Sequence, residues 1–349
     1  MSRRHRFLPS IRLVGVACLG GLLALGSLTS STAPSVVSGA EREQLLDERE
    51  GFGRAAGEGS TAWPVVVVTT LRDAGPGSLR DAVGRSGSWI RFASGLRGTI
   101  ELTRPLAVRG DLVVDGRGAD ITLHADASTD LIRIHEVDNV VLTNIRFSGG
   151  EDAIQVFQGA TDIWIHHVTA TAAADEIVSM TGDGRRPDRI TVSWSRFEDA
   201  GKVMLLGASE REAAHAPDRV TLHHNVFANS SDRQPLIRFA RVHFYNNHVI
   251  AWGEDGSGQA VRVGAGGQLA SDGNVFDDRF GRPAVIPEDL GTRGYVRSTG
   301  DVITGRTSIV ERSPQAVFDP RDHYAFVLDE AGESLRVALA EGAGWRAEP

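Results

Sequence analysis

The chain has 349 residues, a formal net charge of −8 and a single cysteine, Cys18. One cysteine excludes intramolecular disulfides. The acidic balance and the lack of a basic patch argue against a nucleic-acid partner. A polyanionic substrate would therefore have to be bound by local charge, because the overall charge of the chain would not attract it.

The first forty residues predict a secretory signal peptide over residues 1–40. Arginines at positions 3, 4, 6 and 12 accompany an apolar run from Leu13 to about Leu28, which is the usual order of such a signal. Residues 41–62 are charged and contain several glycines, so we expect a flexible lead there. No later apolar run is long enough to span a membrane. These features predict a secreted, extracellular protein.

The first regular elements after this lead are a short helix and a strand. The segment from Gly77 to Val83 predicts a helix with Ser78 as its N-cap. The segment from Asp111 to Gly116 predicts a strand. Repeat proteins need a cap on their terminal unit, so we expect the helix to cover the N-terminal end of the repeats that follow.

From Val140 onward a short apolar pattern recurs, with apolar residues at i, i+2 and usually i+7, and a polar turn near i+4 and i+5. Its period of two predicts strands, and its repetition every 22 to 30 residues predicts a solenoid. We therefore predict an all-β domain over residues 63–349, a single-stranded, right-handed parallel β-helix. The segments that carry the pattern are Val140/Leu142/Phe147, Ile163/Ile165, Ile190/Val192/Phe197, Val220/Leu222/Phe227, Val242/Phe244/Val249 and, more weakly, Leu269/Phe276.

The i+5 position of three successive coils is an asparagine. These are Asn225, Asn247 and Asn274. Amides at equivalent positions of stacked coils lie about 4.8 Å apart, so we expect them to form a ladder.

Charged residues occupy a second repeated position. Twelve residues after successive starts lie Asp152, Asp175 and Lys202, and thirteen after the next lies Arg233. Lys202 is the only lysine among 37 basic residues, and an ammonium and a guanidinium are not interchangeable. Two acids followed by two bases along one ridge suit an acidic sugar polymer. The acids can hold calcium, a cation that prefers oxygen ligands, and the bases can neutralise a substrate carboxylate.

From about Val68 to Gly344 the chain resembles the pectate lyase family, which also includes pectin lyases. The set of motifs in this order carries the resemblance, and the segment from Arg233 to Asn247 is the most specific. The matching pieces are Val68-Thr69-Thr70-Leu71, Gly75-Pro76-Gly77-Ser78-Leu79-Arg80, Asp115-Gly116-Arg117-Gly118, Glu151-Asp152-Ala153-Ile154, Ile163-Trp164-Ile165-His166-His167, Val192-Ser193-Trp194, Lys202, His224-Asn225, Arg233-Gln234-Pro235-Leu236-Ile237-Arg238 and His243-Phe244-Tyr245-Asn246-Asn247.

The resemblance implies a role for each of five residues. Arg233 matches the family's proton-abstracting arginine, Lys202 and Arg238 match its binders of the substrate carboxylate, and Asp152 and Asp175 match two calcium ligands. The implied activity is cleavage of polygalacturonate by β-elimination, which leaves unsaturated uronate ends. The implied partner is an acidic plant polysaccharide, and we expect a monomer.

The chain departs from the family pattern at the acidic positions. Ser179 and Gly150 stand where further acids are common in the family. Glu151 and Glu176 adjoin the predicted ligands, but neighbouring side chains of a strand point to opposite faces. We therefore expect a weakened calcium site.

Three alternatives remain open. The first is a calcium-independent lyase for methylated pectin, and the second is a non-catalytic β-helix that binds polysaccharide. The third concerns five histidines that could suggest a zinc site. They fall at strand corners of different coils, which favours hydrogen bonding at those corners: His166, His167, His223, His224 and His243.

Overall fold

A computed structural model describes residues 38–254 and 256–347. The predicted signal peptide lies outside the described residues as far as residue 37. Within the described ranges, no helix is both long and apolar enough to cross a membrane.

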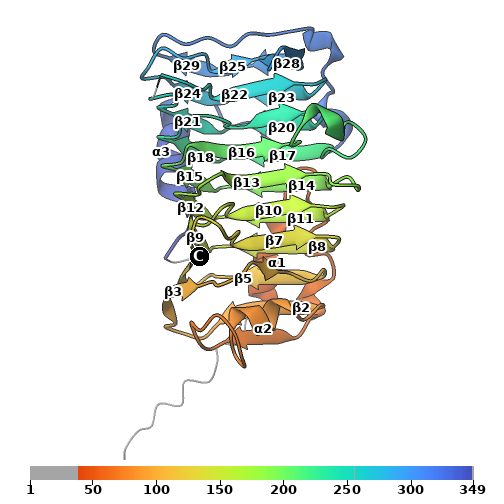
Figure 1. Cartoon of the computed structure of the whole chain (residues 1–349), viewed down its shortest axis with the longest axis vertical. Helices are drawn as coiled ribbons and strands as arrows, with labels where there is room; N and C mark the ends of the chain where they lie inside the picture. The colour runs from red at the N-terminus through yellow and green to blue at the C-terminus, as the bar shows by residue number, and fades with distance from the viewer. Residues whose placement is uncertain (1–37, 255, 348–349) are drawn as a thin grey trace, which may run out of the picture. The chain divides into compact units, whose positions relative to one another are not determined.

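Three parallel sheets form the body of the described chain, and each coil except those at the two ends contributes one strand to each sheet (Figure 1). Sheet A contains, in order, β1 (Val65–Val68), β2 (Ser88–Phe92), β5 (Leu112–Asp115), β8 (Asp138–Thr143), β11 (Thr161–His166), β14 (Asp188–Ser193), β17 (Arg219–His223), β20 (Arg241–Tyr245), β23 (Gln268–Asp272) and β28 (Tyr295–Thr299). Sheet B contains β3 (Arg97–Glu101), β6 (Asp120–Ala125), β9 (Arg146–Gly149), β12 (Thr169–Thr171), β15 (Arg196–Glu198), β18 (Val226–Ala228), β21 (His248–Ile250), β24 (Val275–Asp277) and β29 (Val302–Thr304). Sheet C contains β4 (Leu106–Ala107), β7 (Ile132–His135), β10 (Ile154–Phe157), β13 (Glu176–Thr181), β16 (Lys202–Leu206), β19 (Leu236–Arg238), β22 (Val261–Gly264) and β25 (Val285–Ile286). This arrangement confirms the predicted parallel β-helix.

The remaining elements lie outside these sheets. β26 (Glu288–Asp289) and β27 (Thr292–Arg293) form an antiparallel pair. The helices are α1 (Gly39–Asp47), α2 (Leu79–Val83) and α3 (Glu333–Gly342), with 3₁₀ turns η1 (Ser60–Ala62), η2 (Glu210–Glu212), η3 (Pro314–Ala316) and η4 (Pro320–Asp322).

The recurring apolar residues pair across the coils as the sequence pattern predicts. The i positions lie opposite one another in sheet A, from Val140 to Leu269. The i+7 positions lie opposite one another in sheet B, where Phe197 and Phe227 pack with ring centroids 5.5 Å apart. Both rows are buried, so each coil adds the same apolar layer to the core.

The asparagine ladder is also confirmed. The Nδ2 atoms of Asn225 and Asn247 each donate to Oδ1 of the next asparagine, at 3.0 Å. Ser195 N donates to Asn225 at one end, and Asn274 donates to the Asp301 carboxylate at the other. These bonds satisfy amides that are fully buried, and a buried polar group without a partner would be costly.

The predicted capping helix is α2. The Ser78 side chain accepts a hydrogen bond from Asp81 N, as an N-cap does. Leu79, Ala82 and Val83 are buried in the main core at the N-terminal end of the stack. The cap therefore covers apolar surface that a further coil would otherwise cover.

The predicted flexible lead over residues 41–62 differs from the structure. α1 begins after a capping box formed by Ser38 and Glu41. Leu45 and Leu46 of α1 are buried against the outer face of sheet A, and burying such a side chain contributes about 1.5–3 kcal/mol. Gly53 N then donates to Thr191 Oγ1 of β14, at 2.9 Å. We call residues 39–63 the N-terminal arm, because they lie along sheet A.

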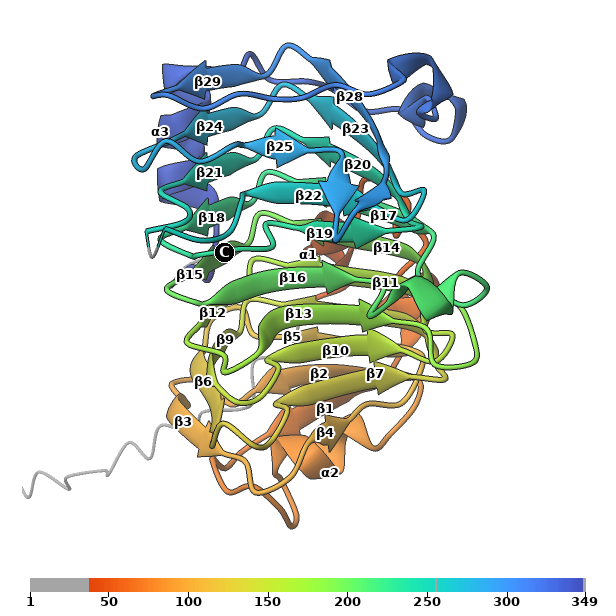
Figure 2. The same cartoon turned by 45° about the horizontal axis from the view of Figure 1, so that its top comes forward.

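The C-terminal segment also lies along the stack. α3 runs beside β18, β21 and β24 of sheet B in both views (Figures 1 and 2). Leu335 and Leu339 of α3 pack on Val226 and Val275. α3 therefore covers apolar side chains on the outer face of sheet B.

Candidate functional site

Acidic and basic side chains meet where the strands of sheet C begin. Glu176, the first residue of β13, lies opposite Lys202, the first residue of β16. The pairing of Ile154 with Val178 places Asp152 one coil earlier at the same position. Asp152 Oδ1 accepts a hydrogen bond from Glu176 N at 2.9 Å. The strand register that aligns the two residues therefore also brings them into contact.

At one coil, the strand register differs by one residue from the register that the sequence count predicted for the charged ridge. Phe147 to Ile154 spans seven residues, whereas the equivalent stretch from Ala170 to Val178 spans eight. The turn between β12 and β13 therefore has one residue more than the turn before it. As a result Glu176 takes the position that the sequence count gave to Asp175.

Glu176 is the residue of this cluster that sequence reasoning missed. Alternation along a strand predicted that its side chain would point away from the predicted ligands, but Asp175 precedes the strand, so alternation does not relate the two residues. Asp152, Asp175 and Glu176 each offer a carboxylate oxygen, and these three oxygens lie within 4.8 Å of one another. The extra residue in the turn brings in a third acid beside the two predicted ones.

Two ion pairs join this acidic cluster to the predicted bases. Lys202 Nζ contacts Asp175 Oδ1, and Arg233 Nη1 contacts Glu176 Oε1. The side chains of Lys202 and Asp175 are 41% and 46% exposed, so this end of the cluster is open to solvent. A polymer could reach it without entering a closed cavity.

The environment shifts the pKa values of the three carboxyl groups in different directions. Burial, together with the charges of Asp175 and Asp152, raises the pKa of Glu176 to about 7, against the influence of Arg233. Burial also raises the pKa of Asp152. Burial acts the same way on Asp175, but the hydrogen bond and charge of Lys202 outweigh it and lower the pKa of that carboxyl. When all three carboxyl groups are ionised, their three negative charges exceed the two positive charges of Lys202 and Arg233.

Asp152 is held rigidly. Its Oδ2 accepts from Gln155 Nε2 at 2.9 Å, and its backbone N donates to Asp130 Oδ1 at 3.2 Å. Asp130 is itself buried and pairs with Arg133. The carboxylate is thus fixed at the bottom of the cluster before any ligand arrives.

Gly150 explains one departure from the family pattern. Its φ is +82°, and an added Cβ would lie 3.0 Å from both Leu131 Cγ and Thr129 O. An aspartate or glutamate there would be strained. The backbone of this turn therefore does not favour an acid at position 150.

Arg238 lies apart from the other predicted residues. Leu206, the last residue of β16, pairs with Ile237, so Arg238 lies level with Gly207. Gly207 is five residues along from Lys202, or about 16 Å at roughly 3.3 Å per residue. Arg238 Nε donates to the buried Asp289 carboxylate at 2.6 Å, and its Nη1 to Ala208 O at 2.7 Å. The structure brings Asp152, Asp175, Lys202 and Arg233 together, but it does not bring Arg238 to them.

Four of the five histidines, His166, His167, His223 and His224, lie where strands of sheet A end, whereas His243 lies in the middle of β20 and not at a corner. Most contact neighbouring side chains or backbone, as the corner interpretation predicts. His223 Nδ1 lies 2.9 Å from His224 Nδ1, and His224 Nε2 lies 3.0 Å from Asp329. His243 Nδ1 lies 2.7 Å from the Tyr324 hydroxyl. His166 and His167 have an acidic neighbour, Glu48 of the N-terminal arm.

Comparisons with known proteins agree with this architecture. A sequence model described as pectate lyase matches residues 113–286. A probable pectate lyase of Solanum lycopersicum is 31% identical over 265 residues, which cover 68% of this chain and 63% of that protein. The chain thus spans less than two thirds of the length of that relative.

Two solved structures share the fold. The major allergen from cedar pollen superposes with a TM-score of 0.71 at 23% identity, over 88% of this chain and 95% of that one. A Bacillus pectate lyase in complex with trigalacturonate superposes with a TM-score of 0.66 at 21% identity, over 85% of this chain and 98% of that one. At these identities the likeness concerns the fold.

Proposed function

Because this chain belongs to the pectate lyase family, we propose that it is a polysaccharide lyase that cleaves polygalacturonate by β-elimination and leaves unsaturated uronate ends. One observation carries the proposal. Lys202 and Arg233 converge on the cluster of Asp152, Asp175 and Glu176, at a solvent-open position of sheet C. The substrate class is also supported by the trigalacturonate complex of the related fold.

The acidic cluster fits a calcium ion. Three carboxylate oxygens within 4.8 Å of one another form an all-oxygen donor set, which calcium prefers. Burial raises the pKa of Asp152 and raises that of Glu176 to about 7, and a bound cation would favour the ionised forms of both carboxyl groups. Asp152, Asp175 and Glu176 would hold the ion, and when bound it would supply positive charge for a uronate carboxylate.

The bases would act on the sugar. In β-elimination a base removes the proton on the carbon beside the uronate carboxylate, and that C–H electron pair forms the new double bond to C4. The C4–O bond then breaks, and its oxygen leaves with the electron pair and takes up a proton. Lys202 would stabilise the negative charge that develops on the carboxylate, as preorganised cations do.

We assign the proton abstraction to Arg233. Its ion pair with Glu176 favours the protonated guanidinium, because an opposite charge favours the charged form. If Glu176 is engaged by another cation, Arg233 loses this stabilisation and becomes a better proton acceptor. The ion pair with Glu176 thus belongs to the protein without substrate. Release of Arg233 from Glu176 would accompany substrate binding.

One observation favours the calcium-independent alternative, a lyase for methylated pectin. Lys202 and Arg233 already pair with two of the three acids, so the protein's own cations partly neutralise the cluster. A methylated substrate also lacks the carboxylate charge that calcium would bridge. Substrate and calcium dependence therefore separate the two candidates.

The test is ultraviolet detection of unsaturated uronate ends from polygalacturonate and from methylated pectin, with and without calcium. We expect activity on polygalacturonate that rises with calcium and is strongly reduced in Asp152→Asn. Equal activity on methylated pectin after chelation would favour the alternative. No unsaturated ends from either polymer, with binding retained, would identify a non-catalytic polysaccharide-binding protein.

We also propose that the protein is secreted and acts as a monomer on an acidic plant polysaccharide. The support for secretion is the signal-like pattern of residues 1–40. Detection of the processed protein in the culture medium would test it, and size-exclusion chromatography with light scattering would test the monomer.

A further inference from the structure

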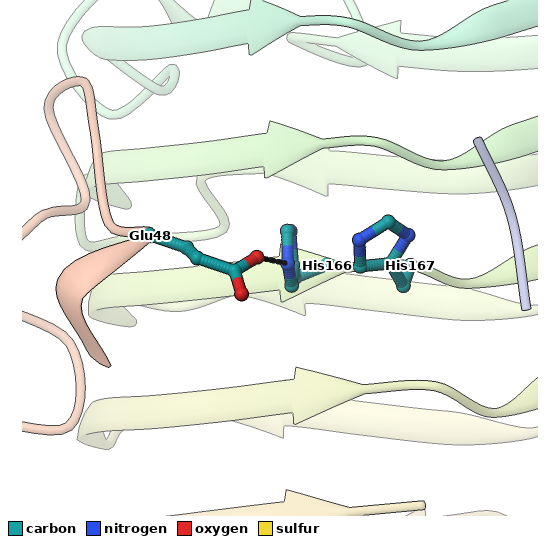
Figure 3. A group of neighbouring side chains, drawn as sticks. All are labelled: Glu48, His166 and His167. Atoms are coloured by element: carbon teal, nitrogen blue, oxygen red, sulfur yellow. Dashed lines mark hydrogen bonds and ion pairs between the residues drawn. The ribbon is translucent and has the colours of Figure 1, made fainter. Parts of the chain in front are cut away.

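A second group of ligand-type side chains lies on the outer face of sheet A. It joins the N-terminal arm to the end of β11 (Figure 3), where Glu48 points toward His166 and His167 follows directly. The ligand atoms of the three residues lie within 4.8 Å of one another. None of them belongs to the acid–base cluster of sheet C.

The partners of the two imidazoles determine which nitrogens are available. His167 Nδ1 lies 3.2 Å from Gly344 O, and a carbonyl only accepts, so Nδ1 carries the proton of the neutral ring and Nε2 carries the lone pair. His166 Nδ1 lies 3.0 Å from Ser193 Oγ, and its Nε2 lies 3.0 Å from Glu48 Oε2. The serine hydroxyl can accept or donate, so it can support either tautomer of His166.

Both rings thus have Nδ1 anchored, which leaves Nε2 as the nitrogen available to an ion. Anchoring one ring nitrogen by a carbonyl or hydroxyl while the other binds the ion is the usual arrangement of metal-ligating histidines. Burial lowers the pKa of His166 to about 3 and that of His167 to about 2, so both rings are neutral, as ligands must be.

We propose that Glu48, His166 and His167 form a metal site for a divalent transition ion of the zinc type. Two imidazoles and one carboxylate leave a fourth position for water, a donor set known from zinc enzymes. A polar cavity of about 180 Å³ adjoins all three residues and provides room for that water. The nitrogen donors distinguish this site from the all-oxygen cluster on sheet C, which suits a harder cation.

Arg346 is the competing cation at this site. Its Nη2 contacts His167 Nε2, the atom that would bind the metal. Its backbone is held separately, since Arg346 N donates to Asn144 Oδ1 at 2.9 Å. The guanidinium can therefore turn away while the chain stays in place. Zinc binding would replace the guanidinium of Arg346 with the zinc ion beside Glu48.

The test is calorimetric titration of the whole protein with Zn²⁺, with cobalt(II) absorption as a readout of coordination geometry. Glu48 is 44% exposed, so Glu48→Gln should fold. His167 has φ +47°, a conformation that asparagine tolerates, so His167→Asn should fold too. The matched control is His224→Asn, because His224 is also a corner histidine with positive φ (+54°).

We expect Glu48→Gln and His167→Asn each to weaken zinc binding at least tenfold. Arg346→Gln should tighten it, because it removes the competing charge, while His224→Asn and Asp152→Asn should leave it unchanged. Tetrahedral cobalt bands should appear in the wild-type protein and disappear in His167→Asn. The proposal is overturned if neither the wild-type protein nor Arg346→Gln binds zinc, or if the Glu48 and His167 variants bind as the wild type does.

Discussion

Arg233 reaches across the coil that carries Lys202 and pairs with Glu176. The Glu176 side chain is only 3% exposed, whereas that of Arg233 is 22% exposed. The proposed base is thus held by a buried acid that lies two strands away in sheet C. This ion pair leads to the first two predictions.

Arg233→Lys should abolish elimination and leave the fold intact. Lysine keeps a charge for Glu176 but lacks the guanidinium's geometry and basicity. Loss of a general base typically lowers the rate about 10²–10⁴-fold. The measurement is the rate of formation of unsaturated ends, with circular dichroism melting as the control for folding. Full activity in this variant would rule out Arg233 as the base.

Calcium affinity should rise with pH through about pH 7. The folded protein raises the pKa of Glu176 to about 7, so this carboxyl is largely protonated below that pH and ionised above it. A metal ligand must be deprotonated, and affinity therefore grows as the proton is lost. Calcium titrations at pH 6 and pH 8 should differ in the wild type and much less in Glu176→Gln. Equal pH dependence in the two proteins would contradict Glu176 as a ligand.

Lys202→Ala should lower turnover about 10²–10³-fold, the typical cost of losing one preorganised group. Lys202→Arg is the sharper test. Arg retains the charge beside Asp175, yet it cannot present a compact ammonium. A loss of tenfold or more, about 1.4 kcal/mol in the barrier, would show that the ammonium itself is needed. A nearly neutral Lys202→Arg would show that charge alone suffices.

Asn247→Ala should destabilise the solenoid without touching the acid–base cluster. Asn247 Oδ1 accepts from both N and Nδ2 of Asn225, each at 3.0 Å. Removing the amide leaves two buried donors unsatisfied, at about 1–3 kcal/mol each. Chemical denaturation should show this loss, and Gln315→Ala, at an exposed amide, should show almost none. An unchanged unfolding free energy in Asn247→Ala would mean that the ladder adds no stability.

The sequence predicts the coils well because their determinants are local. Alternating apolar residues and one repeated asparagine are enough to place the strands and the ladder. The position of Glu176 depends instead on one additional residue in the turn before β13, which strand alternation cannot reveal. Arg238 shows a second limit. Its partner Asp289 lies 51 residues away, so the resemblance alone indicates a free arginine where the structure has a buried ion pair.

The N-terminal arm could not be predicted for a related reason. Its charged and glycine-containing composition suggests flexibility, and its stabilising contacts lie far along the chain. Gly53 bonds to Thr191 and Glu48 to His166, at separations of 138 and 118 residues. A metal site that includes Glu48 is equally invisible in the sequence, since only folding brings the arm to the histidines.

The path of the arm also sets an order of events during synthesis. Gly57 bonds to Asn139, Phe52 to Thr221, and the Glu50 carboxylate accepts from the Tyr245 hydroxyl at 2.7 Å. The arm leaves the ribosome before any of these partners exist, and the last of them follows 195 residues later. Coils can form one after another as the chain emerges, but the arm must wait until several have stacked. Residues near the start of the chain are therefore among the last to reach their final place.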